Sequence, residues 1–188
     1  MEIVVLIVVL AVVALLALLL VRLYNGLVQR RLRVDEAWAQ IDVQLKRRHD
    51  LIPNSVAAVR GYMEFEEDVL TRVTEARANA VAAGAQGLAE SAAAENQLTQ
   101  TLRSLFAVVE NYPDLKANQN VMALQEELTT TENQISFSRQ HYNVVVLEYN
   151  TVIAQVPAVM IAGPFGFTAR EFFEAEPEAQ EVPEVRLR

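Results

Sequence analysis

Two histidines are the residues most able to build a metal centre in this sequence. Helical bundles often hold paired iron ions through Glu-x-x-His motifs, whose two ligands lie one helical turn apart. Lys46 lies three residues before His49, and Ser138 lies three residues before His141. Neither histidine completes the motif, so the sequence predicts no metal site of this kind.

Other motifs that carry chemistry are missing from the 188 residues. The chain contains no Cys, which excludes a disulfide, a thiolate zinc site and a cysteine nucleophile. It also contains no H-E-x-x-H, no phosphate-binding G-x-x-x-x-G-K-[ST] and no G-x-S-x-G. We therefore expect no catalytic, cofactor-binding or metal-binding residues, and we expect that the protein is not an enzyme.

The densest cluster of charged and polar side chains lies in residues 42–50. On a helix, Asp42 and Lys46 form an i,i+4 pair, and exposed pairs of this kind are common and weak. The run is therefore expected to be mostly a solvated helix surface. The functional alternative is a docking surface for an acidic partner, made of Asp42, Lys46, Arg47, Arg48, His49 and Asp50.

The net charge of −8 argues against a protein that binds nucleic acid. The charge is unevenly distributed, because residues 22–60 hold eight Lys and Arg against four Asp and Glu. Residues 171–188 hold six Glu against two Arg.

Residues 3–21 carry no charged or strongly polar side chain. As a helix, these nineteen residues rise about 28 Å, close to the roughly 30 Å of a bilayer's hydrocarbon core. A cleaved signal peptide is the weaker interpretation, because only Glu2 and the α-amino group precede the run and no small-x-small cleavage site follows it. Residues 1–22 are therefore predicted to be a transmembrane anchor.

Basic residues follow the apolar run and predict its orientation. By the positive-inside rule, this flank stays in the cytoplasm and the N-terminus lies outside. The same side chains could contact anionic headgroups, worth about 1 kcal/mol each, or could simply signal topology and snorkel. These membrane-proximal residues are Arg22, Arg30, Arg31 and Arg33.

Apolar residues at helical spacing predict four helices. The first runs from residue 3 to about residue 61. Its stripe continues past Pro53, so we expect a kink there and not an end. The others are expected at about 64–83, 88–112 and 114–156, the last with a heptad-like seam. The predicted inward-facing residues are Val34, Trp38, Ile41, Leu45, Ile52, Val56 and Val59; Phe65, Val69, Val73, Ala76 and Ala80; Leu98, Leu102, Leu105, Val109 and Tyr112; and Val121, Leu124, Leu128, Thr131, Ile135, Ser138, Tyr142, Val145, Tyr149, Val152 and Val156.

The helix lengths favour one topology. Outside the membrane the four helices are about 58, 30, 36 and 64 Å long, so alternating up and down nearly cancels the displacements. We therefore predict an all-α protein, with a single N-terminal transmembrane helix that continues into an up-down four-helix bundle at 23–156. A rod that merges the first two helices is the competing arrangement.

The chain after residue 156 divides into two parts. Residues 157–173 are apolar and aromatic, and Pro and Gly break them into pieces too short to span a bilayer. This segment is expected to pack across the base of the bundle, or alternatively to dip into the membrane interface through Phe165, Phe167, Phe172 and Phe173. Residues 174–188 are acidic and are expected to be disordered.

Several stretches resemble the LemA family. They are Tyr24-Asn25, V-D-E-A-W-A-Q-I-D-V-Q-L-K-R-R-H-D-L-I-P-N (34–54), T-E-A-R (74–77), E-N-Q-I-S-F-S-R-Q-H-Y-N (132–143), Y-N (149–150) and the F-G-F…F-F tail. The resemblance implies a bacterial protein with one membrane helix and a helical-bundle domain, and no established catalytic residues. Relatives include a protein of magnetosome membranes, and family genes often lie beside those of membrane metalloproteases.

Two hypotheses about function follow. The first is a non-enzymatic helical scaffold, anchored in the bacterial inner membrane with its bundle in the cytoplasm, that self-associates and organises membrane or membrane proteins. The second is an adaptor for a membrane protease or another envelope enzyme, with 42–50 as the docking surface. The expected partners are the lipid bilayer, further copies of the chain and a membrane protein such as a protease, with no nucleic acid and no cofactor.

Overall fold

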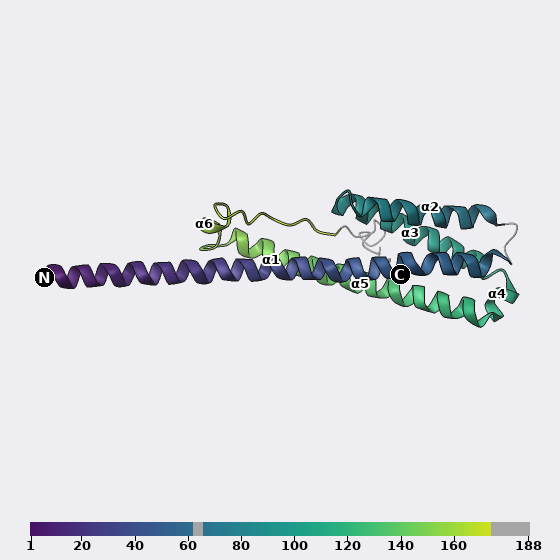
Figure 1. The fold of residues 1–188 in the computed structure, drawn as a ribbon, viewed down its shortest axis with the longest axis horizontal. Coiled ribbons are helices and arrows are strands. Elements are labelled where there is room, and N and C mark those ends of the chain that lie inside the picture. The colour runs from purple at the N-terminus through teal and green to yellow at the C-terminus, as the bar shows by residue number, and fades with distance from the viewer. Residues whose placement is uncertain (62–65, 174–188) are drawn as a thin grey trace, which may run out of the picture. The chain divides into compact units, whose positions relative to one another are not determined.

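The computed structural model describes residues 1–61 and 66–173, and it shows six helices and no strand within them (Figure 1). The prediction of an all-α protein is confirmed. The helices are α1 (Glu2–Arg60), α2 (Glu67–Ala83), α3 (Leu88–Val109), α4 (Pro113–Ala117), α5 (Gln119–Ala154) and α6 (Val159–Ala162). Residues 174–188, predicted to be disordered, lie outside the described residues.

The described chain forms two compact units. Residues 1–39 and 140–172 make up one, which we call the anchor unit. Residues 40–139 and Phe173 make up the other, which we call the bundle unit. Helices α1 and α5 each contribute one end to each unit.

Four helices build the core of the bundle unit: the C-terminal part of α1, α2, α3 and the N-terminal part of α5. Ile52 and Val56 of α1 lie in one buried cluster with Val69 and Val73 of α2. In a merged rod, Ile52 and Val73 would be about 31 Å apart along the axis, at 1.5 Å per residue. The rod is therefore wrong, and the four-helix arrangement is confirmed for this unit.

The predicted stripes mark the buried positions well. Most of the predicted residues of α1, α2 and α3 are buried, and Trp38 and Tyr112 are half-buried. In α5 the buried seam includes Leu128, Thr131 and Ile135. Phe65 lies outside the described residues, and Val156 lies beyond the end of α5 and is exposed.

The helix boundaries needed two corrections. The third helix ends at Val109 and not at Tyr112. The predicted helix at 114–156 is split, because Asn118 has extended backbone angles and separates α4 from α5. The side-chain Oδ1 of Asn118 accepts a 3.0 Å hydrogen bond from the backbone N–H of Asn120, which is how Asn starts a helix. Helix α1, in contrast, continues through Pro53 as expected.

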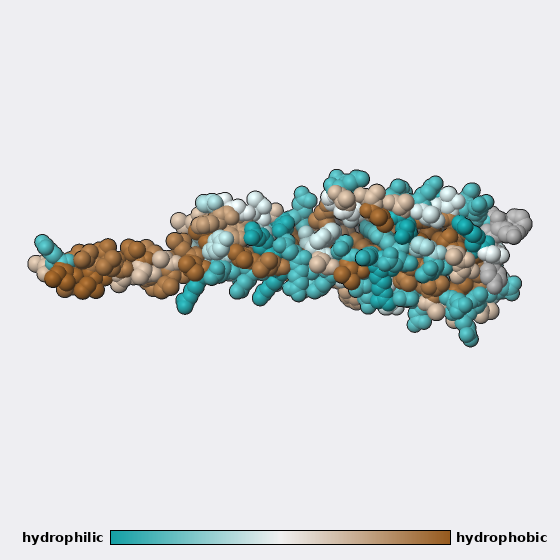
Figure 2. Space-filling model, in the orientation of Figure 1, coloured by the Kyte–Doolittle hydropathy of each residue, from teal (hydrophilic) through white to brown (hydrophobic). Residues whose placement is uncertain are grey.

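The N-terminal stretch of α1 belongs to the anchor unit, and its side chains are exposed. Of the helices in the described part of the chain, α1 alone is long and apolar enough to cross a membrane, and that stretch is wholly unburied. On the face that Figure 2 shows, the N-terminal part of α1 is almost entirely hydrophobic beyond its first residues. This stretch of α1 therefore has the length and composition of the predicted membrane span.

Candidate functional site

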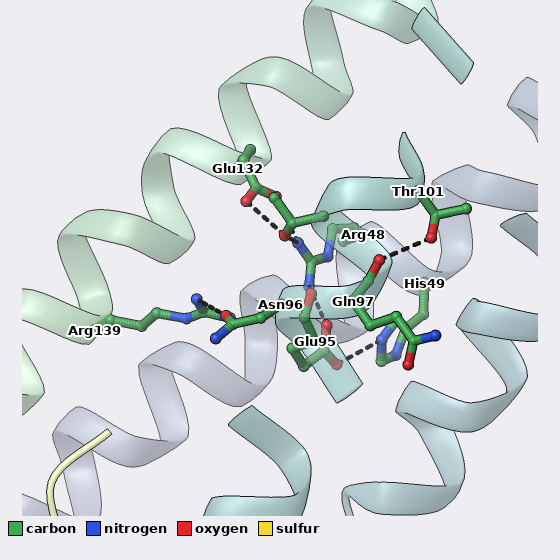
Figure 3. A network of polar contacts seen from close by, with 9 residues as sticks. Arg48, His49, Glu95, Asn96, Gln97, Thr101, Glu132 and Arg139 are labelled. Carbon is green, nitrogen blue, oxygen red and sulfur yellow. Dashed lines mark hydrogen bonds and ion pairs between the residues drawn. The ribbon is translucent and has the colours of Figure 1, made fainter. Parts of the chain in front are cut away.

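A buried arginine lies at the centre of the bundle unit. Arg48 occupies the stripe position between Leu45 and Ile52 on α1, and its side chain is 0% exposed. Its Nη1 donates to Thr99 Oγ1 at 2.9 Å and to Glu132 Oε2 at 2.5 Å, and its Nη2 donates to the Glu95 carboxylate (Figure 3). One guanidinium thus joins α1 to both α3 and α5.

Glu95 is the most enclosed acid of this network, with its side chain 1% exposed. His49 Nε2 lies 2.8 Å from Glu95 Oε1, whereas Arg48 contacts the other carboxylate oxygen, Oε2. Burial raises the pKa of Glu95, but the close contact with His49 and the positive charge of Arg48 outweigh burial and hold the pKa below its usual value. Glu95 is therefore a carboxylate at neutral pH.

Further polar contacts connect the remaining helix to this network. Arg77 of α2 donates from Nε to the backbone carbonyl of His49 at 2.6 Å. Thr99 Oγ1 donates to Glu132 Oε1 at 2.9 Å, a second link between α3 and α5. All four long helices of the bundle unit are therefore tied to one another around residues 48 and 49 of α1.

The geometry of the network suits fixation of the helices better than catalysis. Arg48, Glu95 and Thr99 are all buried, and of the charged groups in the network only Glu132, at 35%, is substantially exposed. Among the residues that the structure describes, no three His, Asp or Glu side chains are grouped so that they could hold a metal ion. Buried ion pairs can specify the register of packed helices, and that is the role that this arrangement can fulfil.

The predicted docking surface is smaller than the sequence indicated. Arg48 cannot belong to it, because the guanidinium is enclosed by two carboxylates and a hydroxyl. His49 is partly buried against Glu95. The residues that remain exposed are Asp42, Lys46, Arg47 and Asp50. Arg47 forms an exposed 2.8 Å ion pair with Glu127 of α5.

Sequence reasoning missed the partners of Arg48. Glu95 and Thr99 precede Leu102 on α3 at steps of four and three, so they extend the predicted apolar stripe toward the start of that helix. A charged residue on such a stripe, like the charged Arg48 on the stripe of α1, is the signal that could have revealed the network. Glu132 follows the buried Thr131 directly and gave no such signal.

Of the four phenylalanines predicted to be membrane-proximal, two are buried and two are exposed. Phe167 is buried in the anchor unit, where its ring lies 5.6 Å from the Tyr24 ring and 5.2 Å from the Arg31 guanidinium. Phe173 is buried in the bundle unit, 4.4 Å from the Arg139 guanidinium. Phe165 and Phe172 are exposed. Of the predicted membrane-proximal arginines, Arg31 is half-buried, while Arg22, Arg30 and Arg33 are exposed.

The last described residues of the anchor unit are fastened through their backbone. Asn150 of α5 donates from Nδ2 to the carbonyl of Arg170 and accepts at Oδ1 from the N–H of Arg170, both at 2.8 Å. The Tyr142 hydroxyl donates to the carbonyl of Glu171 at 3.0 Å, and burial raises the pKa of this phenol. Arg170 also pairs with Asp35 of α1 at 2.7 Å. Residues 168–172, which we call the strap, are thus held against α1 and α5.

Comparisons with known proteins show which sequences this chain is similar to. A family model described as the LemA family matches residues 37–187. Magnetosome proteins MamQ 1 and MamQ 2 of Paramagnetospirillum magneticum are each 26% identical to the chain over 178 residues, covering 82% of it and 65% of their own length. Protein LemA of Metamycoplasma hominis is 23% identical over 129 residues, covering 69% of the chain and 58% of its own length. The chain therefore spans less than two thirds of these relatives.

Proposed function

This chain belongs to the LemA family, as the resemblance of residues 34–54 and the other stretches predicted, and from that premise we propose that it is a non-enzymatic, membrane-anchored helical scaffold. It self-associates and organises the membrane or other membrane proteins. Membership of the family and the apolar stretch of α1 together support a membrane-associated helical protein.

The observation that carries the proposal is the continuity of α1. Its first turns form an unburied apolar surface of membrane-spanning length, and the same helix ends in the core of the bundle unit at Ile52, Val56 and Val59. The ion pairs of Arg48 then bind that helix to α3 and α5. A domain attached to its anchor by an uninterrupted helix is suited to present a surface to the membrane.

The arginines that follow the apolar stretch support the proposed orientation. Arg22, Arg30 and Arg33 are exposed within the first twelve residues after it, where positive charge favours the cytoplasmic side. We therefore propose that the anchor crosses a bacterial inner membrane with its N-terminus outside and the bundle in the cytoplasm. The relatives named as magnetosome proteins are, by name, parts of a structure inside the cell, and this supports a cellular location for the proposed bundle.

Self-association is supported by an exposed apolar pair on α5. Val144 and Leu147 lie one helical turn apart in the anchor unit, and both side chains are exposed. Contiguous apolar surface that stays exposed on a folded protein often marks a protein–protein or membrane contact. A second copy of the chain could cover them while its own anchor lies in the same bilayer.

Native mass spectrometry of the full chain in lipid nanodiscs tests the scaffold. We expect a defined oligomer for the native sequence and a smaller species for V144S/L147S. The matched control is T151A, which changes an exposed residue one turn further along α5 and should leave the oligomer intact. A monomer for the native sequence, with no partner cross-linked in intact membranes, would overturn the proposal.

An adaptor for a membrane protease or another envelope enzyme is the second candidate. It is favoured by the exposure of Asp42, Lys46, Arg47 and Asp50 on one short stretch of α1. The variant K46E/R47E, which leaves the buried Arg48 in place, should abolish co-purification of the partner. Unchanged co-purification would exclude this surface as the docking site.

A further inference from the structure

The short segment around α6 exposes several large apolar side chains. Met160 is 72% exposed, and Val156, Val159 and Phe165 are exposed as well. No Asp, Glu, Lys or Arg occurs between residues 149 and 169. Water-soluble surfaces rarely combine large exposed apolar side chains with twenty-one residues free of charge. We call residues 156–166 the foot.

The foot packs against residues 20–24 of α1. The Phe165 ring packs edge-on against the Tyr24 ring, with 5.3 Å between the ring centroids. Leu20, Val21 and Tyr24 of α1 face Ile161 and Phe165 of the foot across an apolar hollow of about 250 Å³. These α1 residues lie where the unburied apolar stretch ends, so the foot begins where the membrane span stops.

The residues at this level have the character of a lipid–water boundary. Tyr24 is partly exposed and follows the exposed Arg22 by two residues, and Tyr and Arg side chains are both favoured near lipid headgroups. Helix α6 has four residues, and Pro157 and Pro164 bracket it, so the foot cannot span a bilayer. An apolar segment of this kind can lie in the plane of the interface.

We propose that the foot inserts into the interface of the same bilayer that the anchor crosses, with Met160 and Phe165 against the upper acyl chains. This inference rests on the proposed membrane anchoring and adds a second contact to it. The occupant is lipid and not a second copy of the chain, because the foot is continuous in space with the apolar stretch that lipid must already surround. Two contacts, the anchor and the foot, would restrain the rotation of α1 about its own axis.

Spin labelling of the full chain tests the foot. Because the chain contains no Cys, M160C provides a single labelling site without any other change. L16C reports on the anchor, and T130C reports on an exposed position of α5 that lies 24 residues before that helix ends. After reconstitution in phosphatidylcholine vesicles, the accessibility of each label to oxygen and to a water-soluble nickel complex is measured.

We expect labels at 160 and 16 to be more accessible to oxygen than to nickel, and the label at 130 to show the opposite. A label at 160 that reports water while the label at 16 reports lipid would overturn the foot and leave the anchor standing. A label at 160 shielded from both reagents would mean that protein covers the foot, which also overturns the inference. A label at 16 that reports water would overturn the membrane anchoring itself.

Discussion

Replacing Arg48 by Met should destabilise the bundle unit far more than the same replacement at its neighbour Arg47. Removing one partner of a buried ion pair typically costs about 3–5 kcal/mol, because the other charge remains buried without compensation. Glu95 would be left in that state, since its side chain is 1% exposed. Glu132 is 35% exposed, so water can solvate it after Arg48 is removed. His49 remains 2.8 Å from Glu95, and we therefore expect the lower end of the range, about 3 kcal/mol.

Arg47 is the matched control. It has the same chemistry and lies on the same turn of α1, but both members of its ion pair with Glu127 are more than 40% exposed. Exposed pairs contribute about 0–1 kcal/mol, so R47M should have little effect. The measurement is chemical unfolding of the full chain in detergent, followed by circular dichroism. Equal losses of unfolding free energy for R47M and R48M would refute the reasoning.

A double-mutant cycle then separates the ion pair from the packing of the side chains. In R48M/E95M both buried charges are replaced by apolar groups of similar length, which is often neutral compared with the native pair. The double variant should therefore be more stable than the sum of the two single losses predicts, by at least about 1 kcal/mol. Additive losses would show that Arg48 and Glu95 are not coupled.

Two further predictions concern the pH dependence of the network and the attachment of the strap. Because the folded-state pKa of Glu95 is held below its ordinary 4.5, its contribution to stability is complete above about pH 4.5 and is lost as the pH falls through the lower folded-state value. Acid titration of unfolding should therefore be steeper for the native sequence than for E95Q, and parallel curves would contradict this. Replacing Asn150 by Ala removes both hydrogen bonds to the backbone of Arg170, so trypsin should cleave after the exposed Arg170 faster than in the native chain. T151A, an exposed neighbour that makes no such bonds to the strap, is the control, and equal cleavage rates in all three proteins would show that Asn150 does not hold the strap.

The sequence by itself determined the helices and the faces that they bury. Residues at steps of three and four fall on one side of any helix, so Val34, Ile41, Val73 and Leu102 could be assigned to a core before their partners were known. The apolar run at residues 3–21 predicted a span of membrane thickness in the same way. Asn118 was missed, because one residue that leaves the helical conformation and caps the next helix hardly alters the apolar period.

Only the tertiary structure decided which charged residues are buried and which are exposed. Arg47 and Arg48 are the same amino acid at adjacent positions, yet one is exposed and the other is fully buried. The carboxylates that compensate Arg48 lie 47 and 84 residues away along the chain, and only folding brings them to it. Helical spacing is a local property that each segment carries by itself. The burial of a charge depends on partners from distant segments, so it is settled only when those segments pack together.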